Sequence, residues 1–208
     1  MKKRVYLLIL TIVITVSTQS CGIFNREVKT VQYSSSFNNN EITLIMEADT
    51  TTPLRVLKTT NLKDSIILRT KCDNITPNTK DPFLNTLIKR MYATVTDSAS
   101  LGVGIAAPQV GVSKNIILVQ RVDKEGEPFE AYINPRIIQW TDKKQECPEG
   151  CLSIPNIRGV TKTRAYAVLI EYYTPAGEKK SEMVEGYTAV IFQHETDHLN
   201  GILFIDHL

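Results

Sequence analysis

The sequence lacks the features that mark several specialised classes of protein. It has 24 Lys and Arg residues against 22 Asp and Glu, so no excess of positive charge points to nucleic acid as a partner. Its four cysteines are too few for a disulfide scaffold in a chain of 208 residues. No apolar run reaches the about 20 residues that a membrane-spanning helix requires. With 42% hydrophobic residues, the chain can instead fold as one domain around a core of its own.

The N-terminus has the pattern of an export signal. Residues 1–20 begin with three basic side chains, continue with an apolar run from Val5 to Val16, and end in small polar residues. Cys21 follows directly and resembles the lipid-carrying first residue of bacterial lipoproteins. We therefore expect an exported bacterial protein that a lipid on Cys21 anchors to a membrane. The alternatives are a plain cleaved signal with Cys21 near the cut, or a cytoplasmic protein if the segment is no signal.

Residues 21–53 predict a mostly irregular tether. Runs of Ser, Asn and Thr dominate this segment, and such polar runs bury too little apolar surface to fold alone. Within it, Ile42–Met46 could form one strand against the folded body. We expect that body to be a single domain over residues 54–208.

The domain mixes helices and strands without the regular alternation of a parallel α/β fold. Asp81 and Pro82 form a helix start, after which apolar residues recur at steps of three and four. Gly201 ends the last helix. The helices are expected at 82–96 and 188–200, and the strands at 115–120, 167–173 and 182–184. The pattern predicts an α+β fold.

The first of three chemical motifs lies on the last helix. His194 and His198 are four residues apart, so both imidazoles lie on one helix face with Glu195 beside them. Two imidazoles and a carboxylate suit a metal ion and a general base. The alternative is an ordinary polar helix surface.

Two histidines need at least one more protein ligand to make a catalytic metal site. The chain ends at Leu208, too soon for the downstream helix that supplies a glutamate in thermolysin-type enzymes. Phe204 occupies the position of the third histidine in the metzincin pattern. Asp206 and His207 lie beyond the helix end and are poor candidates. We therefore expect the third ligand to lie upstream.

The second motif, Glu149-Gly150-Cys151-Leu152-Ser153, offers that ligand. A thiolate with two imidazoles leaves one coordination position open for water. Cys151 could alternatively be a small buried hydrophobic residue, or form a disulfide with Cys72 or Cys147.

The third motif runs from Gly102 to Gly111 and reads GVGIAAPQVG. A phosphate-binding loop is a poor interpretation, because no helix start with Lys and Ser or Thr follows. Its small residues would let a ligand backbone approach closely, and Gln109 adds a neutral hydrogen-bond donor. The remaining interpretation is a simple glycine-containing turn before a strand.

In this order the three motifs resemble those of the peptide deformylase family, and the resemblance extends from about Leu54 to the C-terminus. It implies a deformylase fold, with mixed or antiparallel sheets around a C-terminal metal-binding helix. It also implies one divalent metal ion per chain, Fe²⁺ in many members, although Zn²⁺, Ni²⁺ or Co²⁺ would suit the same ligands. The implied metal ligands are Cys151, His194 and His198.

The resemblance assigns the other roles as well. Glu195 would be the general base, while the Gln109 side chain and the Leu152 backbone N–H would stabilise the oxyanion. The implied substrate-binding residues are Gly104, Gly150, Val190, Ile191 and Arg158. The stretch from Arg158 to Arg164 is one residue longer than is common in the family.

The expected activity is removal of the formyl group from N-formylmethionyl peptides, with release of formate. Two alternatives use the same residues: a metallopeptidase that cleaves other amides, and a non-catalytic lipoprotein that binds formyl peptides. Whether Cys72 pairs with Cys147 is left open by the sequence.

Overall fold

The computed structural model describes residues 35–78, 80–98 and 101–208, and the residues from 35 onward belong to one compact unit. The predicted signal over 1–20, the lipid site at Cys21 and the first part of the tether lie outside the described residues. Within the described part of the chain, no helix is long and apolar enough to cross a bilayer.

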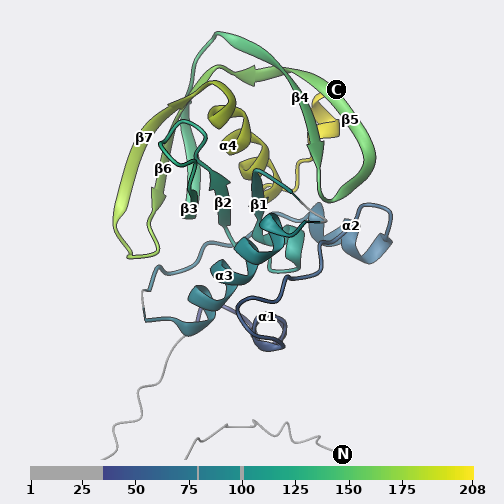
Figure 1. The fold of residues 1–208 in the computed structure, drawn as a ribbon, viewed down its shortest axis with the longest axis vertical. Helices are drawn as coiled ribbons and strands as arrows, with labels where there is room; N and C mark the ends of the chain where they lie inside the picture. Colours follow the sequence, from purple (N-terminus) through teal and green to yellow (C-terminus); the bar gives the residue numbers. More distant parts are fainter. Residues whose placement is uncertain (1–34, 79, 99–100) are drawn as a thin grey trace, which may run out of the picture. The chain divides into compact units, whose positions relative to one another are not determined.

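The fold is α+β, as expected, and its two sheets are antiparallel (Figure 1). The larger sheet has the strand order β1-β2-β3-β6-β7, and the smaller one is a hairpin of β4 and β5. The strands are β1 (Gly104–Ala106), β2 (Ile116–Gln120), β3 (Phe129–Trp140), β4 (Lys144–Cys151), β5 (Ile154–Ala165), β6 (Ala167–Tyr173) and β7 (Lys179–Glu185). The helices are α1 (Asn39–Met46), α2 (Leu62–Leu68), α3 (Pro82–Thr96) and α4 (Gly186–Leu199), with short 3₁₀ helices η1 (Ala107–Val110) and η2 (Phe204–His207).

Most of the predicted elements are confirmed. The helix expected at 82–96 is α3, which Asp81 caps by accepting hydrogen bonds from the N–H groups of Phe83 and Leu84. The helix expected at 188–200 is α4, and Gly201 follows it with a φ of +72° that favours glycine. The predicted strands are β2, β6 and β7, and the last two pair along their whole length.

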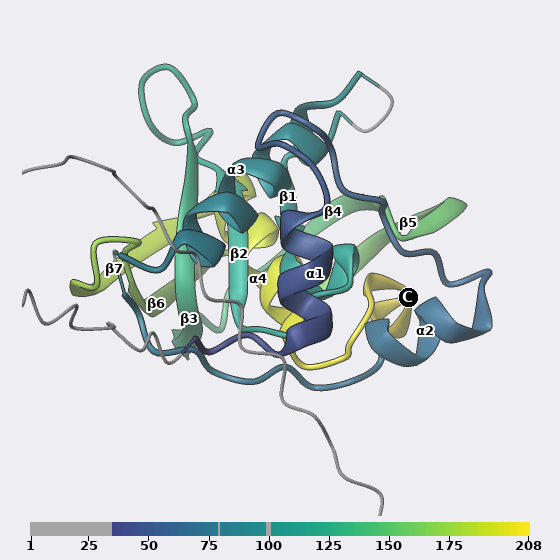
Figure 2. The ribbon, with the colours of Figure 1, turned by 90° about the horizontal axis from the view of Figure 1, so that it is seen from below.

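Strand β2 shows why the central strands are almost continuously apolar. Ile116 and Leu118 pack into the core cluster that contains α3, whereas Ile117 and Val119 pack into the cluster that contains α4. Successive side chains of a strand point to opposite faces, so the large sheet is covered on both sides. Figure 2 shows α3 and α1 in front of the sheet and α4 behind it. This arrangement fixes α4 firmly between the two sheets.

The small sheet contains a β-bulge in the stretch between Arg158 and Arg164. Gln145 pairs with Arg164 and Cys147 pairs with Thr161, so two steps along β4 oppose three steps along β5. Such a β-bulge bends a strand and re-aims its side chains. Arg164, which lies at this bulge, is buried and contacts Glu149 on the partner strand.

The prediction of a strand at Ile42–Met46 is wrong, because these residues belong to helix α1. Asn38 caps the helix, and the side chain of Glu41 accepts a hydrogen bond from the N–H of Asn38 in return. Ile45 is fully buried against the core, so α1 belongs to the folded unit instead of the tether in which the sequence analysis placed it.

The disulfide left open by the sequence is absent from the structure. Cys72, Cys147 and Cys151 are all free thiols. Cys72 packs in the core between the large sheet and α4, while Cys147 lies on β4. The disulfide interpretation of Cys151 is therefore wrong as well.

Candidate active site

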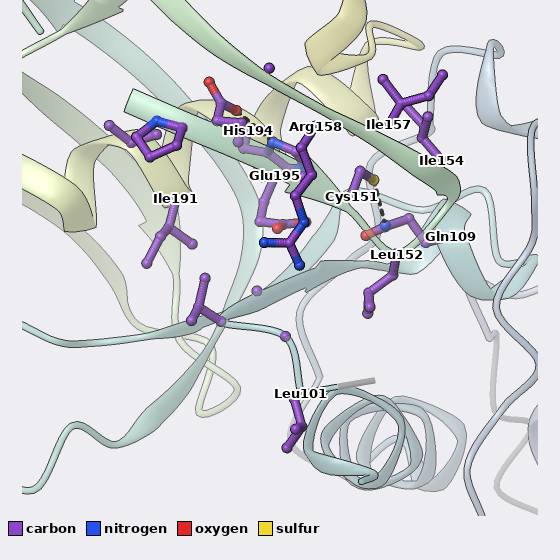
Figure 3. Close-up of a pocket in the computed structure, with 18 of the residues that line it drawn as sticks. Leu101, Gln109, Cys151, Leu152, Ile154, Ile157, Arg158, Ile191, His194 and Glu195 are labelled. Atoms are coloured by element: carbon purple, nitrogen blue, oxygen red, sulfur yellow. Dashed lines mark hydrogen bonds and ion pairs between the residues drawn. The ribbon is translucent and has the colours of Figure 1, made fainter. Parts of the chain in front are cut away.

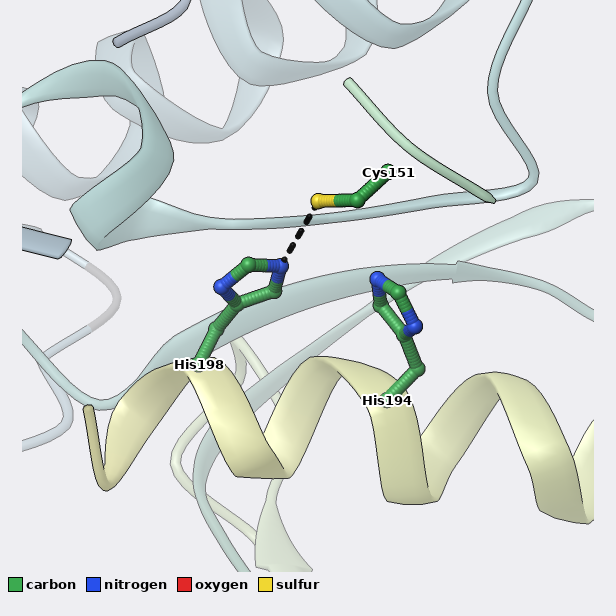
Figure 4. A group of neighbouring side chains, drawn as sticks. All are labelled: Cys151, His194 and His198. Carbon is green, nitrogen blue, oxygen red and sulfur yellow. Dashed lines mark hydrogen bonds between the residues drawn. The ribbon is translucent and has the colours of Figure 1, made fainter. Parts of the chain in front are cut away.

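The structure brings the three expected metal ligands together. His194 and His198 lie one turn apart on the same face of α4, and Cys151 faces them from the end of β4 (Figure 4). One ligand atom of each residue lies within 4.8 Å of the others, and the Cys151 Sγ lies 3.2 Å from the His198 Nε2. A thiol and two imidazoles at this spacing fit a tetrahedral site with one position left for a small ligand.

A buried carboxylate on β4 orients the first histidine. The Glu149 Oε2 lies 2.8 Å from the His194 Nδ1, which leaves the other ring nitrogen to face the Cys151 side of the site. Arg164 donates to both oxygens of Glu149, at 2.8 and 3.0 Å, and also to Asp197 at 2.6 Å. These contacts hold the pKa of the Glu149 carboxyl at about 2 despite its burial. The imidazole is thus held in one orientation by a fixed negative charge.

Glu195 lies in the same site with an unusually free carboxylate. Its side chain is buried, and its Oε2 has no hydrogen-bond partner among the residues that the structure describes. Burial raises the pKa of this carboxyl to about 7. A carboxyl group that titrates near neutral pH can both accept and return a proton, which is the requirement for a general base.

Gly104 on β1 makes room for that carboxylate. A Cβ atom at this position would lie 2.5 Å from the Glu195 Oε1 and 2.9 Å from the Ile191 Cγ2. Both distances are too short for real Cβ contacts. The packing of α4 against β1 therefore requires glycine at position 104, independently of any ligand.

Gln109 enters the site from η1. Its Oε1 accepts a hydrogen bond from the N–H of Ala106 at 2.8 Å, which turns the NH₂ group toward the thiol. The Nε2 lies 3.5 Å from the Cys151 Sγ and 3.3 Å from the Ser153 Oγ. A neutral donor is thereby aimed at the point where the three ligand side chains meet.

Gln109, Cys151, His194 and Glu195 line an open cleft of about 850 Å³ (Figure 3). Arg158 extends across it near Glu195, and Ile191 lies on its wall. The remaining residues expected to bind substrate also line the cleft: Gly104, Gly150 and Val190. Leu152, whose N–H was expected to donate to an oxyanion, lines it as well.

Several residues that the site uses had no predicted role. Glu149 was part of the second motif, yet its contact with His194 joins β4 to α4 and leaves no periodic signal in the sequence. Arg164 lies next to the bulge in β5 and is buried, and neither feature has a local sequence signal. Ser153 is fully buried and accepts a hydrogen bond from Gln109.

Comparison with known proteins places the chain in a family. The model of the polypeptide deformylase family matches residues 56–208. The chain belongs to this family. The peptide deformylase of Halothermothrix orenii is 44% identical over 140 residues, which cover 67% of this chain and 86% of the relative. The peptide deformylase of Desulforudis audaxviator is 42% identical over 121 residues, or 57% of this chain and 76% of the relative.

Solved structures agree with the sequence relatives. A class I type b peptide deformylase from Acinetobacter baumannii, with Met-Ala-Ser bound, superposes with a TM-score of 0.66 at 35% identity and covers 76% of this chain and 99% of its own. Peptide deformylase from Thermotoga maritima gives a TM-score of 0.66 at 35% identity, over 75% of this chain and 97% of its own. The deformylase fold predicted from the motifs is therefore confirmed. Residues 35–55, which include α1, precede the region matched by the family model.

Proposed function

We propose that this chain hydrolyses the N-formyl group of N-formylmethionyl peptides or proteins in a metal-dependent reaction that releases formate. The observation that carries the proposal is the position of Glu195. Its carboxylate is buried, has no hydrogen-bond partner at Oε2 in the described part of the chain, and adjoins a Cys-His-His cluster toward which Gln109 also points. Membership in the polypeptide deformylase family supports the same reaction.

In this proposal Cys151, His194 and His198 hold one divalent metal ion. Bound there, the ion would supply an activated water near neutral pH and polarise the formyl oxygen. The soft thiolate with two imidazoles suits Fe²⁺, which we propose as the metal, and also Zn²⁺, Ni²⁺ or Co²⁺. A ferrous site outside the cytoplasm would be open to oxidation, so an exported Fe²⁺ enzyme would need an anaerobic habitat, and zinc would suit the same ligands in an aerobic one.

The protein itself transfers the proton of the attacking water and stabilises the negative charge that develops on the formyl oxygen. Glu195 accepts a proton from the attacking water and donates it to the departing amine. The Gln109 amide and the Leu152 backbone N–H stabilise the oxyanion, and each such donor contributes about 3 kcal/mol where it has been measured. A thiolate ligand weakens the Lewis acidity of a metal relative to a third imidazole. More of the stabilisation of the oxyanion must therefore come from these two hydrogen-bond donors.

The cleft accommodates an extended peptide in this proposal. Gly104 and Gly150 allow its backbone to lie beside the β-strands in a strand-addition mode. Val190 and Ile191 line the pocket for the methionine side chain, and Arg158 lies at the rim. The Acinetobacter relative binds Met-Ala-Ser, which is the product expected from formyl-Met-Ala-Ser.

Two alternatives, a metallopeptidase and a non-catalytic formyl-peptide-binding lipoprotein, receive no support from the comparisons. A peptide panel separates the three. Metal-loaded protein should release formate from formyl-Met-Ala-Ser and leave acetyl-Met-Ala-Ser and free Met-Ala-Ser intact. Cleavage of only the acetylated or free peptides would indicate a peptidase, and binding without turnover would indicate the non-catalytic protein.

We further propose that the chain is exported by a bacterium and is anchored to a membrane through a lipid on Cys21. The basic start, the apolar run and the cysteine at position 21 support this location. The substrates would then be formylated peptides or proteins at the membrane, instead of nascent chains at cytoplasmic ribosomes.

A further inference from the structure

Three consecutive residues that precede α2 bind both segments that carry the proposed oxyanion donors, η1 and the turn between β4 and β5. The N–H of Leu57 donates to the carbonyl of Gln109 at 2.8 Å. The Nζ of Lys58 donates to the carbonyl of Leu152 at 2.5 Å. The N–H of Thr59 donates to the carbonyl of Ser153 at 2.9 Å. We call residues 57–59 the strap.

The strap contacts the tight turn that connects β4 and β5. Strand β4 ends at Cys151 and β5 begins at Ile154, and these two residues pair, so Leu152 and Ser153 alone connect the strands. The strap binds both carbonyls of this turn. The planar peptide group that joins Leu152 to Ser153 contains the Leu152 carbonyl, so fixing this carbonyl leaves only the φ and ψ of Leu152 to set the orientation of the adjoining peptide that carries the Leu152 N–H.

The strap is itself anchored. Asp64 on α2 accepts a hydrogen bond from the N–H of Lys58 at 3.0 Å. Arg55 holds the same carboxylate through two hydrogen bonds at 2.7 and 2.9 Å. Leu57 is buried, which fixes the other end. The ammonium of Lys58 forms no ion pair within the described part of the chain, and it donates to the Leu152 carbonyl.

We infer that Lys58 is a positioning residue that sets the orientation of the Leu152 N–H relative to Gln109, and so aligns the two oxyanion donors. This inference rests on the proposed function. Lys58 acts through the Leu152 peptide and needs no contact with the substrate. Its charge strengthens the hydrogen bond to the carbonyl, since charge-assisted hydrogen bonds are shorter and stronger than neutral ones.

The role predicts a particular kinetic signature. Oxyanion donors act in the transition state, so misalignment should lower kcat and leave KM nearly unchanged. Complete loss of one donor costs about 100- to 1,000-fold in kcat. Misalignment of a donor that is still present should cost less, and we expect about a tenfold loss for Lys58→Met.

The test compares Lys58→Met with Lys58→Arg and with the control Lys63→Met, which removes an exposed lysine from α2. All are made in the full chain and loaded with the same metal. Lys58→Met should lose about tenfold in kcat on formyl-Met-Ala-Ser, with KM and metal content unchanged. Lys58→Arg should recover most of the loss, and Lys63→Met should match the wild type.

Amide hydrogen exchange provides a readout that is independent of activity. In Lys58→Met the amides of Leu152 and Ser153 should exchange faster than in the wild type, whereas Lys63→Met should leave them unchanged. Unchanged exchange at these amides would overturn the inference, whatever the kinetics. A wild-type kcat in Lys58→Met would also overturn it. So would a rise in KM as large as the fall in kcat. If the wild type itself releases no formate, the proposed function fails. The exchange data then test by themselves whether Lys58 restrains the turn at Leu152 and Ser153.

Discussion

Gly104 and Glu195 lie so close together that the site has no space for a side chain between them. A Cβ on Gly104 would lie 2.5 Å from the Glu195 Oε1 and 2.9 Å from the Glu195 Cγ. Strand β1 and helix α4 are both packed in the core, so moving either one to make room for a side chain would disrupt close packing. The space left by the glycine therefore sets where the carboxylate lies.

Gly104→Ala should displace the Glu195 carboxylate and lower kcat by about 100-fold, because an error of 1 Å in the position of a catalytic group can cost that much. Metal content should stay at the wild-type level, since none of the three ligands is moved directly. Gly150→Ala should lose much less, because its Cβ would approach only the flexible Arg158 side chain, at 3.4 Å. Steady-state kinetics with metal analysis checks both variants, and equal losses in the two would contradict the steric account.

Glu149→Gln should weaken metal binding about 10- to 100-fold, because Glu149 is the partner that orients His194. It should also lower the free energy of unfolding by about 3 kcal/mol, since Arg164 is buried and loses its bidentate carboxylate. Chelator competition and urea unfolding measure the two effects. The control is Glu146→Gln on the same strand, whose ion pair with Lys162 is exposed and should contribute little. Wild-type metal affinity in Glu149→Gln would show that the contact with His194 is dispensable.

The recognition of the fold from sequence succeeded where the determinants are local. Helix α4 and its two histidines follow from a spacing of four residues, and β2 follows from a continuous apolar run. Helix α1 was missed because its short β-branched run suits a strand as well as a helix. The spacing of Asn38 and Glu41 was the available signal, since it forms a capping box.

The parts of the site that sequence could not reveal are contacts between distant segments. Glu149 reaches His194, and Lys58 reaches Leu152, across separations of 45 and 94 residues. Such pairs depend on how the hairpin of β4 and β5 folds over α4, and no periodicity encodes that. Gly104 was singled out by its motif for approach of a ligand, but its closest neighbour in the structure is a side chain of the protein itself.

The acid stability of the domain should depend on Asp123. Hydrogen bonds from Arg121, and to a smaller extent from Thr188, hold the pKa of this carboxyl at about 2. An unperturbed aspartate in the unfolded chain has a pKa of about 3.9. The folded state is therefore stabilised by this group above about pH 4, and that stabilisation is lost as the pH falls toward 2. In Asp123→Asn the free energy of unfolding should change less over this range. Parallel acid-unfolding curves would contradict the prediction.

Cys21→Ser should release the protein from the membrane fraction if Cys21 carries a lipid. The wild type, expressed in a bacterium, should remain with membranes after washing at high salt, because acyl-chain burial is insensitive to salt. The variant should either be found in the soluble fraction or retain its N-terminal segment uncleaved. Mass spectrometry of the mature N-terminus distinguishes these results. An unmodified cysteine in a soluble wild-type protein would remove the anchor from the proposal.

The most direct test of the proposed chemistry is formate release from formyl-Met-Ala-Ser by wild-type protein and by Glu195→Ala, both loaded with Fe²⁺ without oxygen and analysed for metal. The wild type should release one formate per peptide hydrolysed. Glu195→Ala should bind one metal ion per chain through Cys151, His194 and His198 and yet show no measurable turnover. Turnover by the variant at the wild-type rate would contradict the assignment of Glu195 as the general base. Absence of formate release by the metal-loaded wild type would contradict the deformylase activity itself.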